Sequence, residues 1–341
     1  MAAWWELVKG NPVEWLLEPD GQNPGVRYLA LRDLESFPAD SYELIQAKND
    51  AFSRGTIAAI LAKIRPEGYW VKPGSGYGPK FTGSVWSLMI LAQLGADVTH
   101  PKVQRAAEYL LEHTISPVGW FSYNGMNPGL LHCHAGYVAA TMLDIEAGQD
   151  AGVKAALEWH ARIITGIGIA KPDSQEVVRY YRYAPGPDFI CSANAGKTCA
   201  WGVVKTMNAM GRVPYKQRSN TMQKAIDMGR RFLFETDLAI CDFPTRDKTQ
   251  DRTSWFKLGF PMVYSSDVLE ILEVLTRLGY GADARLQGVW DLVLDKQDDQ
   301  GRWPMESSHN GKMWADIEEK GRPSKWVTLR VLRVLKAAFP A

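Results

Sequence analysis

The sequence has few cysteines, no long apolar run and almost no net charge. Four cysteines in 341 residues are too few for the disulfide framework of a small secreted protein, so we expect reduced thiols. No apolar stretch reaches the ~18 residues that a membrane-spanning helix needs. The first residues also lack the basic and apolar parts of a signal peptide. These absences predict a cytoplasmic protein without a membrane span.

The charged residues nearly cancel, with 39 Lys and Arg against 38 Asp and Glu. Proteins that bind nucleic acid or anionic lipid usually carry an excess of basic residues. Neither kind of partner is therefore predicted, while a homo-oligomer remains possible.

What the sequence does contain is a repeated pair of helices. Apolar segments begin roughly every fifty to seventy residues, which is typical of stacked helical hairpins. Because these segments are apolar on most sides, we expect them to be packed on both sides as inner helices. The expected inner helices are 26–34, 84–94, 133–146, 198–210, 265–278 and 324–337. The expected amphipathic outer helices are 4–17, 41–64, one that follows His100-Pro101, 151–164, 218–234 and 282–296.

Six inner and about six outer helices predict an all-α fold, an (α/α)6 toroid formed by residues 1–341 as a single domain. Connections from an inner to an outer helix are short, as at 147–150, whereas 65–83, 116–132, 166–197, 238–264 and 298–323 are long. Long loops without secondary structure are uncommon and usually functional. We therefore expect the functional site on the face where the inner helices begin and a purely structural opposite face.

The long loops and helix starts are rich in aromatic residues. Rings that line a pocket favour an apolar or aromatic small molecule as the ligand, although any single ring could instead pin its loop to a helix end. The predicted substrate-binding residues are Tyr77, Trp86, Trp120, Tyr123, Tyr181, Trp255, Phe260, Tyr264, His309 and Trp314.

Three loops contain a Gly-aromatic turn, clearest at 297–303 with the sequence QDDQGRW and weaker at 65–70 and 116–120. This turn resembles the QW repeat of the squalene-cyclase and prenyltransferase toroid family, in which the Gln caps a helix end and the Trp stacks on the preceding turn. Segments 77–81, 311–314 and 323–326 look similar to stand-alone, single-toroid bacterial members of that family. The resemblance implies the toroid fold.

The sequence also departs from that family. Triterpene cyclases carry an Asp-x-Asp-Asp segment at the start of an inner helix, and the comparable stretch 264–267, YSSD, keeps only its last acid. A long polyene cyclisation is therefore not expected. Prenyltransferases of this fold hold zinc with Asp, Cys and His, and no clear copy of that segment is present.

Asp267 is the predicted catalytic acid. A carboxyl group buried in an aromatic pocket has a raised pKa and can donate a proton. Capping of the fifth inner helix, with Ser265 and Ser266 beside it, is the competing interpretation.

The remaining catalytic candidates are His132, Cys133, His134, Cys191 and Cys199. They flank the starts of neighbouring inner helices, where a helix dipole lowers a thiol pKa. The linalool dehydratase-isomerase family is similar in having an (α/α)6 barrel with one His and two Cys in an apolar pocket. Inert buried thiols and a capping histidine are the alternatives.

These residues together predict an acid/base enzyme, an isomerase, hydro-lyase or cyclase, that acts on a small apolar terpenoid or aromatic molecule. A non-catalytic ligand-binding toroid and a zinc enzyme that uses the Cys and His side chains are the alternatives, and no other cofactor is predicted. Glu270, Glu273, Arg330 and Arg333 are expected to form ion pairs between neighbouring inner helices.

Overall fold

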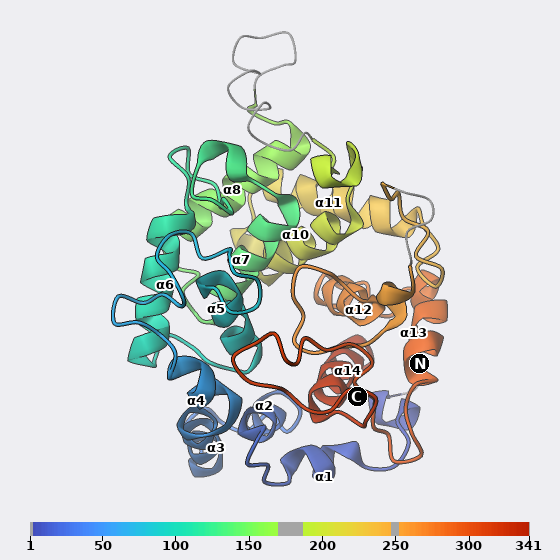
Figure 1. Cartoon of the computed structure of the whole chain (residues 1–341). Helices are drawn as coiled ribbons and strands as arrows, with labels where there is room; N and C mark the ends of the chain where they lie inside the picture. Colours follow the sequence, from blue (N-terminus) through green and yellow to red (C-terminus); the bar gives the residue numbers. More distant parts are fainter. Residues whose placement is uncertain (1–2, 170–186, 247–251, 341) are drawn as a thin grey trace.

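The computed structural model describes residues 3–169, 187–246 and 252–340. Among these residues, six inner helices form a ring (Figure 1). They are α2 (Pro24–Asp33), α5 (Ser84–Gln93), α7 (His132–Asp144), α10 (Ala200–Arg212), α12 (Val268–Arg277) and α14 (Lys325–Ala338). From α5 onward each contacts the next, and α14 contacts α2. The ring is closed by the contact of α2 with the end of α5. An added Cβ at Gly25 of α2 would lie only 2.8 Å from the Leu94 carbonyl oxygen.

The outer layer packs against the outside of this ring. It consists of η1 (Trp4–Leu7) with α1 (Pro12–Leu17), α3 (Tyr42–Ser53) with α4 (Gly55–Leu61), α6 (Pro101–Thr114), α8 (Ala151–Thr165), α11 (Asn220–Phe234) and α13 (Gln287–Leu294). The predicted all-α (α/α)6 toroid is confirmed. The predicted outer helices 4–17 and 41–64 are each interrupted, the second at Gly55, whose φ of +68° favours glycine.

Short segments complete the connections. A two-stranded hairpin, β1 (Ile190–Cys191) and β2 (Lys197–Thr198), precedes α10. Single 3-10 turns are η2 (Asn127–Gly129), η3 (Ser192–Asn194), η4 (Tyr215–Gln217), η5 (Thr253–Phe256) and η6 (Ala284–Leu286).

Burial follows the two layers. In α5 every residue from Ser84 to Leu91 is buried, because this helix is enclosed by ring neighbours and by α6. In α6 the buried residues form one stripe that includes Val103, Ala107 and Leu110. A helix with one apolar stripe leaves its other side in water, so the predicted inner and outer roles are confirmed for this pair.

The Gly-aromatic turns make equivalent contacts in two repeats. The indole N–H groups of Trp70 and Trp303 donate to carbonyl oxygens near the ends of the preceding outer helices, Ile60 at 2.9 Å and Val293 at 2.6 Å. Their backbone N–H groups donate to hydroxyls of the following inner helices, Ser84 and Thr328. Each tryptophan thus joins an outer helix to the next inner helix.

Gln297 lies in the turn after α13 and contacts the N-terminal segment. Its side chain accepts a hydrogen bond from the Lys9 N–H at 2.8 Å and donates one to the Leu7 carbonyl oxygen at 3.1 Å. Since Leu7 is the last residue of η1, Gln297 caps the end of that 3-10 helix and anchors the N-terminal segment.

The closest inner pair is α7 and α10, and Gly136 lies between them. An added Cβ at Gly136 would lie 2.5 Å from the Lys205 carbonyl carbon and 2.7 Å from the Thr206 nitrogen. Gly136→Ala is therefore expected to lower the free energy of unfolding by about 1–3 kcal/mol, since backbone must move. Urea unfolding followed by circular dichroism measures this change. The control is Gly21→Ala, whose Cβ would meet nothing within 4 Å, and equal effects of the two substitutions would contradict the close approach.

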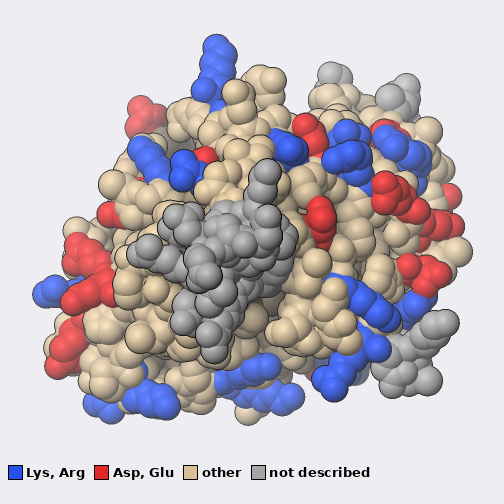
Figure 2. Space-filling model, turned by 90° about the horizontal axis from the view of Figure 1, so that it is seen from above, with Lys and Arg blue, Asp and Glu red and all other residues tan. Residues whose placement is uncertain are grey.

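The surface carries both signs of charge. On the side shown in Figure 2, basic and acidic side chains are interspersed, mostly toward the edges of the view. Among the described residues, the search for a helix with the length and apolar character needed to cross a membrane finds none.

Candidate active site

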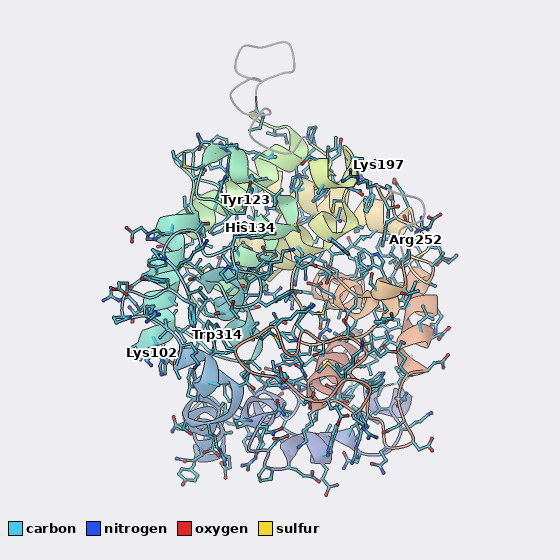
Figure 3. The ribbon with its side chains drawn as sticks, viewed as in Figure 1. Lys102, Tyr123, His134, Lys197, Arg252 and Trp314 are labelled. Atoms are coloured by element: carbon cyan, nitrogen blue, oxygen red, sulfur yellow. The ribbon has the colours of Figure 1, made fainter. Side chains whose placement is uncertain are left out.

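A cluster of aromatic rings occupies the face where the inner helices begin, which we call the long-loop face. The cluster consists of Tyr77, Phe81, Trp86, Tyr123, His134, Tyr137, Trp201, Trp255, Tyr264 and His309. Tyr77 is central to it, with ring centroids 5.4 Å from Trp86, 5.5 Å from Tyr123 and 5.7 Å from His134. Figure 3 labels Tyr123 and His134 close to each other near α7, in the upper part of the view. This aromatic cluster brings six of the ten predicted substrate-binding residues together: Tyr77, Trp86, Tyr123, Trp255, Tyr264 and His309.

The other predicted rings have separate environments. Trp120 is fully buried in a second apolar cluster with Leu130 and Ile163, so it supports the α8 side of the fold. Phe260 stacks on Trp326 at 4.5 Å. The Trp314 indole N–H donates to the Thr82 carbonyl oxygen at 3.0 Å, which holds the loop before α14 against the start of α5. Tyr181 lies outside the described residues.

His134 is the polar side chain of the aromatic cluster whose hydrogen-bonding capacity is used least. It is fully buried, and neither ring nitrogen has a hydrogen-bond partner among the described residues. Burial lowers the pKa of its imidazole to about 3, so the ring is neutral near pH 7. Tyr137 lies one helical turn later, at 5.2 Å between ring centroids, and is also buried, and its hydroxyl has no partner within the described part of the chain. Buried polar atoms are nearly always paired, so these two groups mark a candidate ligand position.

His132 has a different role, although it lies only two residues away. Its Nδ1 is 3.0 Å from Nε2 of His160 on α8, and the two rings stack. Burial, and then the neighbouring His132, lower the pKa of His160. The side chains of residues two apart on a helix point about 200° apart. His132 and His134 therefore cannot belong to one site. His132 holds α7 against α8.

The three predicted thiols do lie close together. Cys191 pairs across the β1–β2 hairpin with Lys197, two residues before Cys199, and Cys133 interacts electrostatically with both cysteines. Burial is the main reason that the pKa of Cys133 is raised to about 11. The neighbouring Cys191 thiol, and then burial, raise the pKa of Cys199. The prediction that a helix start lowers the pKa of Cys133 and Cys199 is therefore wrong, because desolvation and the neighbouring sulfur outweigh the helix dipole.

Asp267 has three donors around its carboxylate. It is the N-cap of α12 and accepts hydrogen bonds from the Glu270 N–H at 2.7 Å and the Gly259 N–H at 3.3 Å. Arg330 also donates to it, at 3.1 Å. The capping interpretation is thus supported, and the predicted acid role is not.

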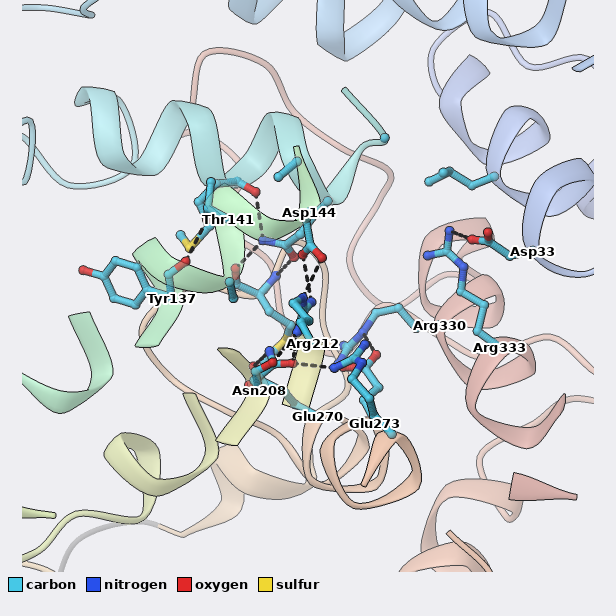
Figure 4. A pocket seen from close by; sticks show the side chains of 18 of the residues that line it. Asp33, Tyr137, Thr141, Asp144, Asn208, Arg212, Glu270, Glu273, Arg330 and Arg333 are labelled. Carbon is cyan, nitrogen blue, oxygen red and sulfur yellow. Dashed lines mark hydrogen bonds and ion pairs between the residues drawn. The ribbon is translucent and has the colours of Figure 1, made fainter. Parts of the chain in front are cut away.

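A pocket of about 440 Å³ opens toward the other end of the ring, on the short-turn face (Figure 4). All six inner helices line it, mostly with their second halves, and Phe260 and Met262 from the connection before α12 complete the lining. Its charged lining residues are Arg32, Lys205, Arg212, Arg277, Arg330 and Arg333 with Asp33, Asp97, Asp144, Glu146, Glu270 and Glu273. The pocket lies on the face that the sequence analysis expected to be purely structural.

Ion pairs organise the walls of this cavity. Lys205 and Glu270 form a buried pair at 2.7 Å, and Arg330 bonds to Glu273 at 2.8 Å. The predicted pairing between neighbouring inner helices is confirmed for Arg330 and Glu273, whereas Arg333 pairs with Asp33 of α2. Phe260 lines the cavity as well.

Tyr137 connects the two regions. It lines the cavity, and its ring also contacts Trp86 at 5.5 Å and His134 at 5.2 Å. Tyr137 therefore separates the pocket on the short-turn face from the aromatic cluster.

A metal site would need several His, Cys, Asp or Glu side chains to converge on one point. Within residues 3–169, 187–246 and 252–340, no three His, Cys, Asp or Glu side chains are arranged to hold a metal ion. The three clustered thiols thus lack a histidine in position to complete a zinc site.

No protein-family model matches the sequence, and no curated protein matches it either. Solved structures with some likeness include the type II terpene cyclase MstE from Scytonema. A variant of that enzyme in complex with geranylgeranyl dihydroxybenzoate shares 13% identity over 83% of this chain and 95% of its own, with a TM-score of 0.32. The ligand-free enzyme shares 14% identity over the same shares of the two chains, with a TM-score of 0.30. At this level of similarity, the fold of this chain rests on its own ring of helices.

Proposed function

We propose that this chain is an acid/base enzyme that acts on a small, mainly apolar terpenoid or aromatic molecule bearing a hydroxyl or carbonyl group. The observation that carries the proposal is the fully buried His134 imidazole, whose two nitrogens lack partners among the described residues. A protein interior rarely leaves such a group unsatisfied. The polar group of a ligand is the natural partner for it.

The surroundings of His134 favour an apolar ligand body. Tyr77 and Tyr137 contact its ring, and Trp86 contacts both of these residues. Aromatic faces bind apolar molecules and stabilise positive charge that develops on carbon.

The chemistry follows from the protonation state of His134. Since burial keeps the imidazole neutral but makes it a weak base, it accepts a proton only from a strongly acidic position, such as substrate carbon beside a developing positive charge. Tyr137, whose pKa burial raises, keeps its proton and serves as a hydrogen-bond donor to the substrate oxygen. The reaction classes that suit this pair are isomerisation and hydration or dehydration. A cyclisation that starts from Asp267 is disfavoured by the contact of its carboxylate with Arg330.

The proposal is tested by offering the purified chain a panel of short terpenoid alcohols, alkenes and phenols. Binding is followed by tryptophan fluorescence and conversion by gas chromatography with mass spectrometry. We expect saturable quenching that Trp86→Phe removes and that the control Trp290→Phe retains, because Trp290 lies on α13, where its indole N–H bonds to Gly281. Binding without conversion would contradict the enzyme proposal and favour a ligand-binding toroid. Quenching that survives Trp86→Phe would place the ligand elsewhere.

A further inference from the structure

The pocket on the short-turn face contains two arginines that share one amide oxygen. Arg212 is the last residue of α10, and Arg277 is the last residue of α12. Each donates a hydrogen bond from its guanidinium group to Oδ1 of Asn208, from Arg277 at 2.8 Å. All three residues line the pocket, and Figure 4 shows Asn208 and Arg212 beside each other in its wall. Two positive charges are therefore held on a single neutral acceptor.

The orientation of the Asn208 amide is fixed by its other contact. Its Nδ2 donates to Oε1 of Glu270 at 3.1 Å, so Oδ1 is the atom that faces the two guanidinium groups. Glu270 itself is paired with Lys205, whose Nζ lies 2.9 and 2.7 Å from the two carboxylate oxygens. The charge of Glu270 is thus already balanced by this lysine.

The two arginines differ in their acidic partners. Asp144 accepts two hydrogen bonds from Arg212, at 2.5 and 2.8 Å. Within the described part of the chain, Arg277 has no carboxylate at ion-pair distance, whereas the other arginines of the pocket each have one. Glu273, one helical turn before Arg277, has both oxygens bonded to Arg330. Arg277 is therefore the pocket guanidinium without a counter-ion among the described residues.

The rest of the lining indicates the size and character of a ligand that would supply this counter-ion. A volume of about 440 Å³ falls in the range of small-molecule sites and exceeds what an inorganic ion fills. The buried side chains of Leu29, Met89, Ala140 and Phe260 form apolar parts of the wall. An anion with an apolar body suits this combination.

The charge balance favours a carboxylate over a phosphate. Six acidic and six basic side chains line the pocket, so a doubly charged phosphate would meet more repulsion than a singly charged anion. A planar carboxylate also matches the fork of a guanidinium group, with which it forms charge-assisted hydrogen bonds.

We infer that this pocket binds an organic monocarboxylate, whose carboxylate group pairs with Arg277 beside Arg212 and whose apolar body lies against the apolar wall. The ligand supplies the counter-ion that Arg277 lacks and relieves the repulsion between the two guanidinium groups. The site is separate from His134, which lies in the aromatic cluster on the other side of Tyr137. It therefore does not depend on the proposed acid/base reaction.

The first experiment measures binding to the full chain by isothermal titration calorimetry at constant ionic strength. The probes are benzoate and hexanoate, with inorganic phosphate and neutral benzamide as comparisons. We expect at least one carboxylate to bind, and benzamide and phosphate to bind at least tenfold more weakly. Arg277→Gln should weaken carboxylate binding by about 10- to 100-fold, as the loss of a hydrogen bond between charged groups does. The control Arg322→Gln, at a position with a 72% exposed side chain, should leave it unchanged.

Two results of the titrations would overturn the inference. One is that neither carboxylate binds or that phosphate binds as tightly as they do. The other is that carboxylate binding is the same in Arg277→Gln as in the unmodified chain.

The second experiment uses thermal unfolding to separate ligand binding from a structural role of Arg277. Without ligand, Arg277→Gln is expected to keep or raise the unfolding midpoint, because it removes one of two like charges from a shared acceptor. The carboxylate that binds should raise the midpoint of the unmodified chain but not that of Arg277→Gln. His134→Leu should retain this shift, so a failure of the aromatic-cluster proposal would leave the present one intact.

The same measurement gives two contrary outcomes. A clearly lowered midpoint in ligand-free Arg277→Gln would assign the arginine to the stability of the fold. A shift that disappears in His134→Leu and persists in Arg277→Gln would place the carboxylate in the aromatic cluster. Either outcome contradicts a carboxylate site at Arg277.

Discussion

Replacement of His134 by leucine is expected to reduce turnover by about 10²–10⁴-fold, the usual contribution of a general base, while the folded state becomes more stable. The stability gain follows from the unpartnered nitrogens of the buried ring. An unsatisfied buried polar group costs about 1–3 kcal/mol, and leucine removes that cost with a side chain of similar size. Turnover of the substrate found in the panel and urea unfolding measure the two effects on one variant.

His160→Leu is the matched control. His160 is also buried, but its Nε2 has a partner in His132 at 3.0 Å. Its replacement leaves the Nδ1 of His132 without that partner, so this variant should lose stability. A catalytic His134 predicts opposite signs of the stability change at the two positions. If both variants lose stability and turnover persists in His134→Leu, then His134 is a structural residue and the proposed base is wrong.

The pH dependence of stability gives a second readout for the same variant. Folded His134 has a pKa of about 3, against an ordinary value of 6.5, so between these values the unfolded chain takes up a proton that the folded chain does not. Stability should therefore fall as the pH is lowered from about 6.5 toward 3. One such group contributes about 1.4 kcal/mol per pH unit in that range. In His134→Leu, the slope of the free energy of unfolding against pH should be smaller by the contribution of one proton.

Replacement of Arg330 by methionine is expected to destabilise the fold by about 3–5 kcal/mol, as does the loss of one partner from a buried ion pair. Arg330 is 7% exposed in its side chain and bonds to Asp267 and Glu273. It also donates to the Gly259 carbonyl oxygen at 2.6 Å. Without the guanidinium, Asp267 and Glu273 both lose this ion-pair partner. Thermal and urea unfolding measure the loss.

The control for this change is Arg322→Met. Arg322 and Glu319 are 72% and 76% exposed in their side chains, and exposed pairs contribute about 0–1 kcal/mol. Asp267→Asn extends the test, since it breaks the buried pair from the other side and should also destabilise. Unchanged stability with lost turnover in Asp267→Asn would instead restore this residue as a catalytic acid.

The architecture could be predicted from the sequence because inner helices are apolar on most sides. The predicted start at residue 84 coincides with the first residue of α5, and the predicted start at 324 precedes α14, Lys325–Ala338, by one residue. The outer helices were harder to predict where turns interrupt them, as at Gly55, since an amphipathic pattern continues across a local break.

The candidate site was only partly predictable. The residues His132 and His134 could be selected from their position at a helix start, but their opposite directions depend on the helical phase relative to α8. The charged cavity was missed because loop length pointed to the other face. Its signal was present in the charged last turns of the inner helices, such as Arg212 and Arg277, whose convergence depends on the closed ring.

The anchoring of the N-terminal segment has a consequence for the order of folding. Trp4 donates its N–H to the Phe339 carbonyl oxygen at 3.1 Å, and Gln297 binds Leu7 and Lys9. These contacts join positions some three hundred residues apart in the chain, so their loop-closure entropy is the largest in the fold. Neighbouring helical hairpins need no such closure and can form locally. The ring is therefore expected to assemble as an open arc and to close at this seam last.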